Sequence, residues 1–274
     1  MAGEALPIAG PAQQPKWHFW TRYRGTLLFA GSIVIAFSAW QVLSTYVFNP
    51  FLIPPPLVVL GTAIPMVESG EIFRHIAISL ARVGIGFATG CAAAIVLGVI
   101  LGRLKVVNDL LDPVIELLRY LSPTAMIPIA VIWFGIGETS KYFLIFWGTF
   151  FIVLINTTAG VMRAPIIRQR AAQCLGASEL QIFLLVMIPS AAPYIVTGMR
   201  IAMASSFMSI IPAEILAADS GIGFLLQQSS ILLQTNRIFV ALLTICVLGF
   251  VFDRLFRVAV DRMLSRYMSY IAMT

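Results

Sequence analysis

The chain has 274 residues, of which 59% are hydrophobic and only 11% charged, and its mean hydropathy is +0.94. A soluble domain carries about 25% charged residues, so this composition excludes a soluble globule and indicates an integral membrane domain. The net charge of +6 comes from basic residues grouped beside apolar stretches, a placement that indicates membrane topology and argues against nucleic-acid binding.

Six apolar stretches follow one another along the chain, each close to the length of about 20 helical residues that crosses a bilayer. We expect an all-α, polytopic membrane protein with six transmembrane helices, at residues 27–47, 79–101, 114–136, 142–162, 191–216 and 238–258. Three consecutive prolines at 54–56 predict stiff, extended backbone followed by a short surface helix. Residues 217–237 predict an outer loop whose short helix dips back toward the bundle.

Lysine and arginine are concentrated in every second connection, and the positive-inside rule places that side in the cytoplasm, together with both termini. The expected cytoplasmic segments contain Lys16, Arg22, Arg24, Arg103, Lys105, Arg163, Arg168, Arg170, Arg262 and Arg266. The expected outer segments contain Arg74, Lys141 and Arg237, with Arg82 near the end of a span. We therefore predict a cytoplasmic segment 1–26, a single transmembrane domain 27–260 and a cytoplasmic tail 261–274.

The connection between the fourth and fifth stretches, residues 165–188, is polar and helix-prone. Pro165 suits the first turn of a helix, and Gly176 is placed to end that helix in the left-handed conformation. Ser178, with Gln181 three residues later, is a capping-box pattern that starts a second helix. The pattern predicts a helix–glycine turn–helix elbow on the cytoplasmic side. This elbow either rests on lipid headgroups, with its arginines on anionic lipid, or binds a cytoplasmic partner.

The spacing in "AAQCLGASELQIFLLVMIP" resembles the EAA motif of the permease subunits of bacterial ABC importers. The matching positions are Ala171, Ala172, Gly176, Val186, Ile188 and Pro189. Around the motif, "YLSPTAMIPIAVIWFGIGETSKYFLIFWGTFFIVLINT" and "AEILAADSGIGFLL" are similar to the permeases for nitrate, sulfonate, taurine and bicarbonate. The resemblance extends from about Ile76 to the C-terminus.

This resemblance implies the type I importer permease fold and a chain that is not an enzyme. The elbow would be the coupling helix, which lies in a groove of a separate ATPase subunit. The residues implied in coupling are Arg170, Ala171, Ala172, Gly176, Ala177, Ser178, Glu179 and Gln181. The chain has no GxxxxGK[ST] phosphate loop, so ATP and Mg²⁺ are expected on the partner and no cofactor on this chain.

The resemblance also implies the partners and the location of the protein. It implies a homodimer or paired permease, two cytoplasmic ATPase subunits, an extracytoplasmic binding protein and the bacterial inner membrane. The expected function is the import of a small anion of the nitrate, sulfonate or taurine, or bicarbonate class. A permease for a neutral or cationic vitamin precursor is the alternative. A stand-alone channel or secondary carrier is a third possibility, although it would not need the elbow.

Arg170 departs from the family pattern, because glutamate usually occupies this position. A glutamate can pair with a basic residue of the ATPase, whereas an arginine needs an acidic or carbonyl partner. Charges at the rim of an interface mainly set association rate and partner choice. We therefore expect this permease to be matched to its own ATPase.

Glu214 and Arg200 are the most unusual residues of the fifth stretch. A charged side chain within a bilayer is costly and is usually functional or paired. Glu214 follows Pro212, and it either lines a gate near the outer side or forms a structural pair that shapes the next loop. Arg200 either attracts anions along the path, extends to the cytoplasmic surface or pairs with Glu116.

Polar and aromatic residues of the third and fourth stretches complete the candidate substrate path. Two prolines interrupt the third stretch beside Ser122 and Thr124, and broken helices with hydroxyl groups often line transporter cavities. Trp133 either narrows the path or packs in the bundle. Asn156 belongs to a polar cluster low in the fourth stretch.

Cysteine and histidine usage predicts neither a disulfide framework nor a metal site. Cys91, Cys174 and Cys246 are far apart in the chain, and His18 and His75 are isolated. A membrane-embedded enzyme would need paired ionisable groups or metal ligands inside the bundle. The absence of such a cluster in the sequence therefore favours a transport protein over a membrane-embedded enzyme.

Overall fold

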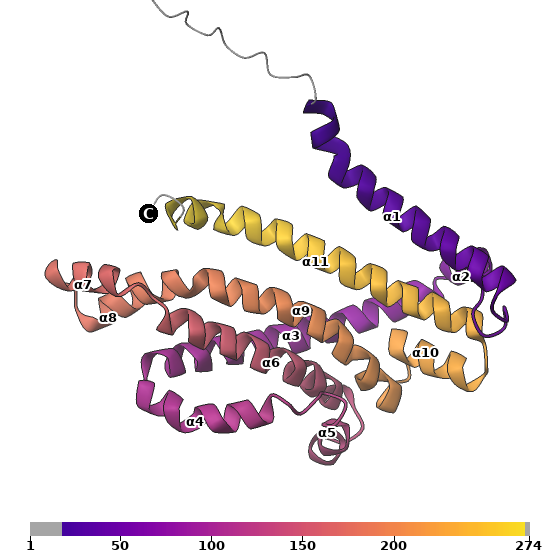
Figure 1. The fold of residues 1–274 in the computed structure, drawn as a ribbon. Helices are drawn as coiled ribbons and strands as arrows, with labels where there is room; N and C mark the ends of the chain where they lie inside the picture. Colours follow the sequence, from indigo (N-terminus) through magenta and orange to yellow (C-terminus); the bar gives the residue numbers. More distant parts are fainter. Residues whose placement is uncertain (1–17, 272–274) are drawn as a thin grey trace, which may run out of the picture. The chain divides into compact units, whose positions relative to one another are not determined.

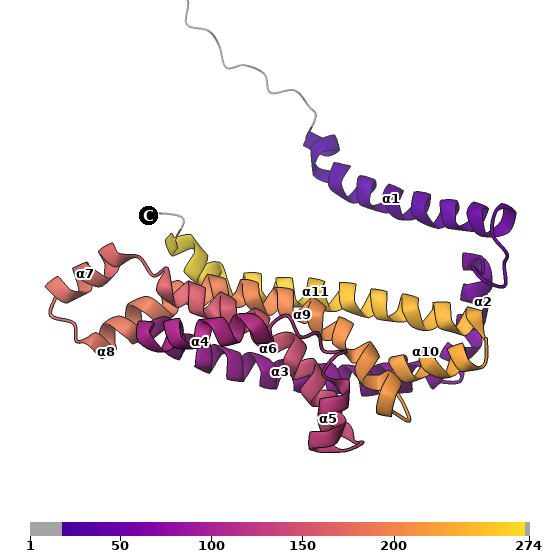
Figure 2. The same ribbon diagram turned by 60° about the horizontal axis from the view of Figure 1, so that its bottom comes forward.

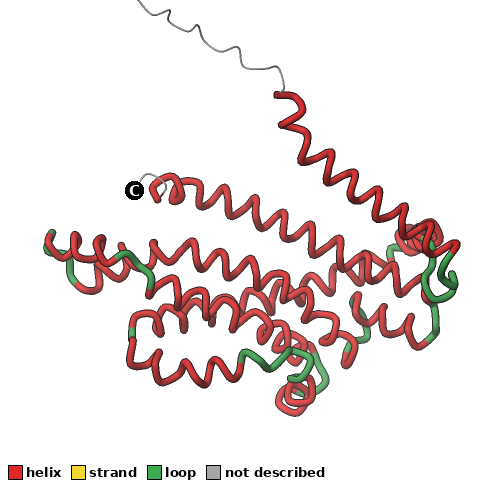
Figure 3. Tube along the Cα trace, in the orientation of Figure 1, coloured by secondary structure: helices red, strands yellow, loops and turns green. Residues whose placement is uncertain are grey.

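The computed structural model describes residues 18–271, and all regular structure in that range is helical (Figures 1 and 3). The elements are α1 (His18–Tyr46), α2 (Pro56–Glu68), α3 (Glu71–Arg103), α4 (Lys105–Leu118), α5 (Ile127–Phe134), α6 (Glu138–Met162), α7 (Ile166–Cys174), α8 (Glu179–Ile182), the π-helical turn η1 (Phe183–Met187), α9 (Ile188–Ala217), α10 (Ile222–Ile231) and α11 (Thr235–Ile271). The all-α class is confirmed. The short helix expected after the prolines is α2, and the short helix expected in the outer loop is α10.

Five helical stretches within the described residues are long and apolar enough to cross a membrane. They are Leu28–Tyr46, Glu71–Arg103, Glu138–Met162, Glu179–Ile215 and Thr235–Val260. These stretches cover the first, second, fourth, fifth and sixth expected spans. Their length and composition identify each of these five stretches as a candidate membrane span.

The third expected span, at 114–136, does not form one long helix, and the interruption expected at its prolines is confirmed. In its place the chain forms α4, a turn and the short helix α5. Pro123 has no amide hydrogen to donate and disfavours helical backbone at the residue before it, while Pro128 lies in the first turn of α5. Trp147 of α6 fixes the turn, because its indole Nε1 donates to the Leu121 carbonyl at 2.9 Å.

Contacts divide the chain into two compact units, with the boundary between Val58 and Val59 inside α2. In the first unit, Ser44 of α1 is fully buried and donates a hydrogen bond to the Ile53 carbonyl. The Leu57 amide donates to Gln41 of α1 at 3.5 Å. These bonds tie the proline-rich segment to α1. The second unit contains α3 to α11 and all of the candidate site residues.

In the second unit, α3, α6 and α9 lie side by side along most of their lengths (Figures 1 and 2). Small residues of α3 recur every four positions, at Gly86, Gly90, Ala94, Gly98 and Gly102. The four glycines of this stripe lie directly against Ile145, Thr149, Thr157 and Val161 of α6. Apolar side chains gain little by moving from lipid to protein, so close backbone approach and van der Waals contact hold such helices together.

Glycines also allow close approach at the contact between α6 and α9. Gly148 and Gly160 of α6 lie against Ser209 and Tyr194 of α9, and Gly198 of α9 lies against Asn156 of α6. These three helices therefore approach one another closely wherever these glycines lie.

We expect Gly86→Ala to lower the melting temperature of the detergent-purified protein and Gly84→Ala to leave it unchanged or raise it. A Cβ at Gly86 would lie 2.6 Å from Ile145 Cβ, whereas nothing lies within 4 Å of a Cβ at Gly84. Both substitutions gain about 1 kcal/mol of helix propensity, but overpacking costs about 1–3 kcal/mol at Gly86 alone. Equal melting temperatures for the two variants would contradict the close α3–α6 contact.

Candidate functional site

The elbow forms as the local sequence signals predict. α7 begins after Pro165, and Gly176 has φ +81°, the left-handed conformation that ends the helix. The Gln181 amide donates to Ser178 Oγ at 3.3 Å, and the Ser178 amide donates to Gln181 Oε1 at 2.8 Å. The predicted capping box is therefore confirmed, and it fixes where α8 begins after the Gly176 turn.

The second arm of the elbow is joined to the helical bundle. Arg103, the last residue of α3, pairs with Glu179 at 3.1 Å, and its guanidinium lies 5.1 Å from the centre of the Phe183 ring. The Ile188 amide donates to the Phe183 carbonyl five residues earlier, which makes the π-helical turn η1 just before Pro189. α8, η1 and α9 thus form one continuous helical stretch. A displacement of the elbow is passed directly to α9.

The surface of the elbow is apolar and basic. Ile167 is 78% and Leu175 88% exposed, and Arg170 is also exposed. Residues 163–178 contain three arginines and no acidic residue. Of the predicted coupling residues, Ala172 and Ala177 are half-buried, whereas Arg170, Ala171, Gly176, Ser178, Glu179 and Gln181 are exposed. Both ribbon views show α7 and α8 extending beyond the ends of α3, α6 and α9 (Figures 1 and 2).

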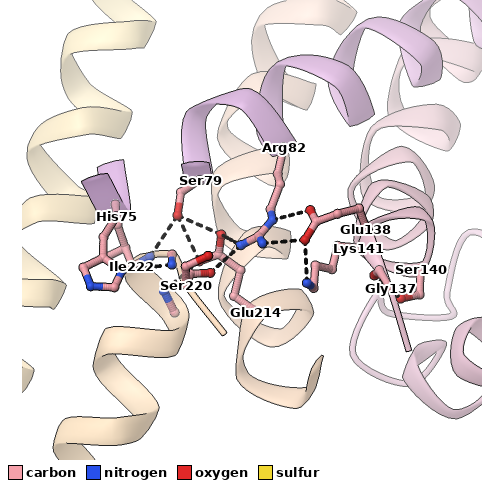
Figure 4. A network of polar contacts seen from close by, with 12 residues as sticks. His75, Ser79, Arg82, Gly137, Glu138, Ser140, Lys141, Glu214, Ser220 and Ile222 are labelled. Carbon is pink, nitrogen blue, oxygen red and sulfur yellow. Dashed lines mark hydrogen bonds and ion pairs between the residues drawn. The ribbon is translucent and has the colours of Figure 1, made fainter. Parts of the chain in front are cut away.

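A buried polar network lies at the opposite end of the same helices (Figure 4). The elbow joins the end of α6 to the start of α9, whereas the network contains Glu138 at the start of α6 and Glu214 near the end of α9. The Glu214 side chain is fully buried and accepts from Arg82 Nη1 of α3 at 2.8 Å. Ser79 Oγ lies 2.8 and 2.9 Å from its two carboxylate oxygens.

Arg82 bridges three elements of the network. Its Nε and Nη2 donate to the two carboxylate oxygens of Glu138 at 2.7 and 2.6 Å, while its Nη1 also donates to the Ser220 carbonyl at 2.5 Å. Lys141 pairs with Glu138 at 2.8 Å. The side chains of Arg82 and Lys141 are 4% and 5% exposed, and that of Glu138 is 48% exposed. Two cations and two carboxylates balance, so the network buries no net charge.

The network also caps α10. The amides of Gly221, Ile222 and Gly223 donate to His75 Nδ1, Ser79 Oγ and Glu214 Oε2 at 3.0, 2.9 and 2.8 Å. The first amides of a helix have no partner within it, and a carboxylate there is further stabilised by the helix dipole. Gly221 has φ +122°, which side-chain-bearing residues rarely adopt. Side chains of α3 and α9 therefore fix where α10 begins.

Glu214 is thus a paired residue that shapes the following turn, one of the two roles that its position in the sequence left open. Arg200 pairs with Asp253 of α11 at 3.2 Å. The alternative pairing of Arg200 with Glu116 is wrong, because Glu116 pairs with Arg119 at 2.9 Å. Arg200 and Glu214 are 14 residues apart on α9, about 21 Å along the helix, so they do not share one site.

The other predicted path residues lie in three separate places. Ser122 and Thr124 are exposed in the turn between α4 and α5, where Ser122 Oγ accepts from the Ala125 amide at 3.2 Å. Trp133 is 63% exposed, and its ring centre lies 5.9 Å from that of Phe143 of α6. Asn156 donates to the Ile152 carbonyl of its own helix at 2.8 Å. Their role in a substrate path stays a prediction.

Sequence reasoning missed His75, Ser79, Arg82, Glu138 and Lys141 as members of one network. A signal was present: an arginine in one apolar helix and a glutamate in another must each find a partner away from lipid. Arg82 is followed 56 residues later by Glu138 and 132 residues later by Glu214, so no local spacing pattern links them.

An apolar groove of about 280 Å³ lies between the second-unit part of α2, α3 and α11. Its lining residues, among them Val67, Phe73 and Leu243, are apolar apart from Thr244. Such a lining suits hydrocarbon and cannot compensate the charge of an ionic solute.

Comparison with known proteins shows which family this chain resembles. Residues 94–265 match the family described as binding-protein-dependent transport system inner membrane component. The taurine transport system permease protein TauC of Escherichia coli is 34% identical over 244 residues, 87% of this chain and 88% of that protein. The putative aliphatic sulfonates transport permease protein SsuC of Bacillus subtilis is 31% identical, covering 90% of this chain and 88% of that protein. The nitrate import permease protein NrtB of Synechocystis is also 31% identical, covering 82% and 84%.

One solved structure supports the fold. An inward-facing structure of the MetNI methionine ABC transporter contains a chain that superposes with a TM-score of 0.61 at 18% identity. The match covers 74% of this chain and 97% of that chain. The type I importer permease fold expected from the sequence is confirmed.

We expect Ser79→Ala to lower the melting temperature more than Thr89→Val. Loss of the Ser79 hydroxyl leaves the buried Ile222 amide without its acceptor, which costs about 1–3 kcal/mol. Thr89, on the same helix, bonds only to the Ile85 and Gly86 carbonyls of its own helix. Differential scanning fluorimetry of both purified variants measures the difference. Similar melting temperatures would show that Ser79 does not hold the start of α10.

Proposed function

Because the chain belongs to the family of binding-protein-dependent transport system inner membrane components, we propose that it forms the translocation path of an ATP-driven importer for a small anion. Members of this family are permease subunits, which do no chemistry and act with a binding protein and a separate ATPase. ATP and Mg²⁺ would therefore bind on the partner ATPase, and this chain would hold no cofactor.

The elbow is the observation that carries the proposed coupling to an ATPase. Its turn is defined by the left-handed Gly176 and the capping box, it exposes apolar and basic side chains, and it joins α6 to α9, which pack closely against each other. A membrane-surface helix would need only an apolar face toward the lipid and would not need a fixed angle to a second helix. A folded groove on a soluble subunit fits this geometry better. Arg170, Ala171 and Gly176 are the central residues of the proposed contact.

Two copies of this chain, or this chain with a related permease, would bind two ATPase subunits. The elbow would face the cytoplasm, and the buried network would lie toward the binding protein. The distribution of charge supports this orientation. At the network end Arg82 and Lys141 are buried on carboxylates and Arg237 pairs with Glu71, whereas the elbow end carries exposed basic residues such as Arg170.

The relatives support an anionic substrate. Those compared above are permeases for taurine, aliphatic sulfonates and nitrate, and all of these solutes carry an anionic oxygen group. We therefore propose an oxyanion or sulfonate, with bicarbonate in the same class. The substrate would pass between permease subunits, with Ser122, Thr124, Trp133, Asn156 and Arg200 as candidate lining residues.

One observation favours a cationic substrate instead. Asp109 and Asp112 of α4 are both exposed carboxylates, and neither forms a salt bridge within the described residues. Carboxylates on the path would attract cations and repel anions. A cationic or neutral vitamin precursor therefore remains the second candidate.

We expect ATP-dependent uptake of radiolabelled taurine by proteoliposomes that contain this permease, its ATPase and its binding protein. Excess nitrate or an aliphatic sulfonate should compete, whereas a cationic thiazolium compound should not. The control is the same preparation loaded with a non-hydrolysable ATP analogue. Uptake that proceeds without the ATPase would overturn the importer assignment, and competition by the cation alone would favour the second candidate.

We expect Arg170→Glu to weaken binding of the cognate ATPase by about tenfold, close to 1.4 kcal/mol, because a rim charge that has an acidic partner would become repulsive. Wild-type binding should weaken as salt rises, and binding of the variant should not. Surface plasmon resonance with detergent-purified permease measures both. Lys105→Glu makes the same change of charge outside the elbow and serves as the control. Equal affinities for all three proteins would exclude an acidic partner for Arg170.

A further inference from the structure

α10 is joined to α3 and α9 by hydrogen bonds at its N-terminal end, and it also packs against α11. The amides of the N-cap Gly221 and of Ile222 and Gly223 donate to side chains of α3 and α9, and Ile222 and Leu225 are 2% and 1% exposed. At the other end Ser229 is 1% exposed, whereas Ile231 is 71% exposed. The residues that cap α10 therefore fix where its start lies relative to α3 and α9.

The helices that provide these caps form a body that cannot easily deform. A Cβ at any of the four stripe glycines of α3 would come within 3 Å of α6, so the two helices have no room to slide closer or to rotate. Closely packed interiors transmit displacement and do not absorb it. The elbow connects α6 directly to α9, so a movement imposed on the elbow displaces the whole body.

Arg82 connects this body to α10 through a single guanidinium group. The group contacts Glu138 at the start of α6, Glu214 near the end of α9 and the Ser220 carbonyl in the turn before α10. Glu214 in turn accepts from the Gly223 amide of α10. Both helices that flank the elbow are thus tied to α10 at their far ends (Figure 4).

We propose that Arg82 and Glu214 are positioning residues for transport, which make α10 move with the body that the elbow drives. α10 then serves as the moving element at the outer end of the path. The proposal rests on the proposed function, in which an ATPase acts on the elbow. Without the link, the elbow still moves and ATP is still hydrolysed, but α10 no longer follows.

The chemistry of arginine makes the proposal testable. The planar guanidinium has five N–H donors and reaches Glu138 with a two-bond fork while it bonds Glu214 with another nitrogen. Lysine keeps the positive charge but offers one compact ammonium group, which cannot form the fork and reach Glu214 together. Arg82→Lys therefore preserves the charge balance and removes the bridge.

The experiment uses the complete complex of permease, ATPase and binding protein in liposomes. ATP hydrolysis stimulated by loaded binding protein and uptake of radiolabelled taurine, or of nitrate where the wild type prefers it, are measured in the same vesicles. The variants are Arg82→Lys and the double variant Arg82→Met with Glu214→Leu, which leaves no unpaired buried charge. Glu116→Gln breaks the exposed pair of α4 and is the matched control.

Both network variants should assemble and hydrolyse ATP at rates near that of the wild type, while the ATP consumed per imported anion rises about tenfold. The control should keep the wild-type ratio. A parallel fall of hydrolysis and uptake, an unchanged ratio, or failure of both variants to assemble would each overturn the proposal and leave the network a purely structural role. A wild-type complex without ATP-dependent uptake would instead contradict the proposed function.

Discussion

The ion pair of Arg82 with Glu214 is the interaction on which the outer end of the second unit depends. It lies between apolar helices, where an unpaired charge is costly, so each residue requires the other. The same carboxylate accepts a hydrogen bond from the Gly223 amide, and the same guanidinium donates one to the Ser220 carbonyl in the turn before α10. The pair therefore joins α3 to α9 and fixes the start of α10. Arg82 also binds Glu138 of α6, and Glu138 and Lys141 complete the balance of charge.

The bilayer explains why the rest of the bundle is built from small residues. Hydrocarbon surrounds the helices, so burial of apolar side chains provides little force for association. Close contact between backbones takes its place, and the stripe from Gly86 to Gly102 provides that contact along α3. The result is a stiff body with the elbow at one end and the buried network at the other. Such a body suits a protein that must carry a movement across the membrane.

The elbow and the buried network differ in how far the sequence could predict them. The elbow depends on signals a few residues apart: Pro165 before the helix, Gly176 at its end and the pairing of Ser178 with Gln181. All of these formed as expected. The third expected span does not form one helix: its hydropathy suggested a crossing of the membrane, but Pro123 and Pro128 divide residues 114–136 between α4, a turn and α5. The network was missed because its members lie up to 146 residues apart.

The sequence by itself determined that the chain is helical, that it crosses a membrane several times and that it carries a rigid elbow. These properties follow from composition, from hydropathy over about 20 residues and from capping within one or two turns. Only the tertiary structure decided the partners of Glu214 and Arg200, because a buried charge requires a partner but does not specify which helix supplies it. Arg82 is that partner for Glu214 since the glycine stripe brings α3 close to α6, and the glycines of the α6–α9 contact bring α9 close to α6, so one guanidinium can span all three helices.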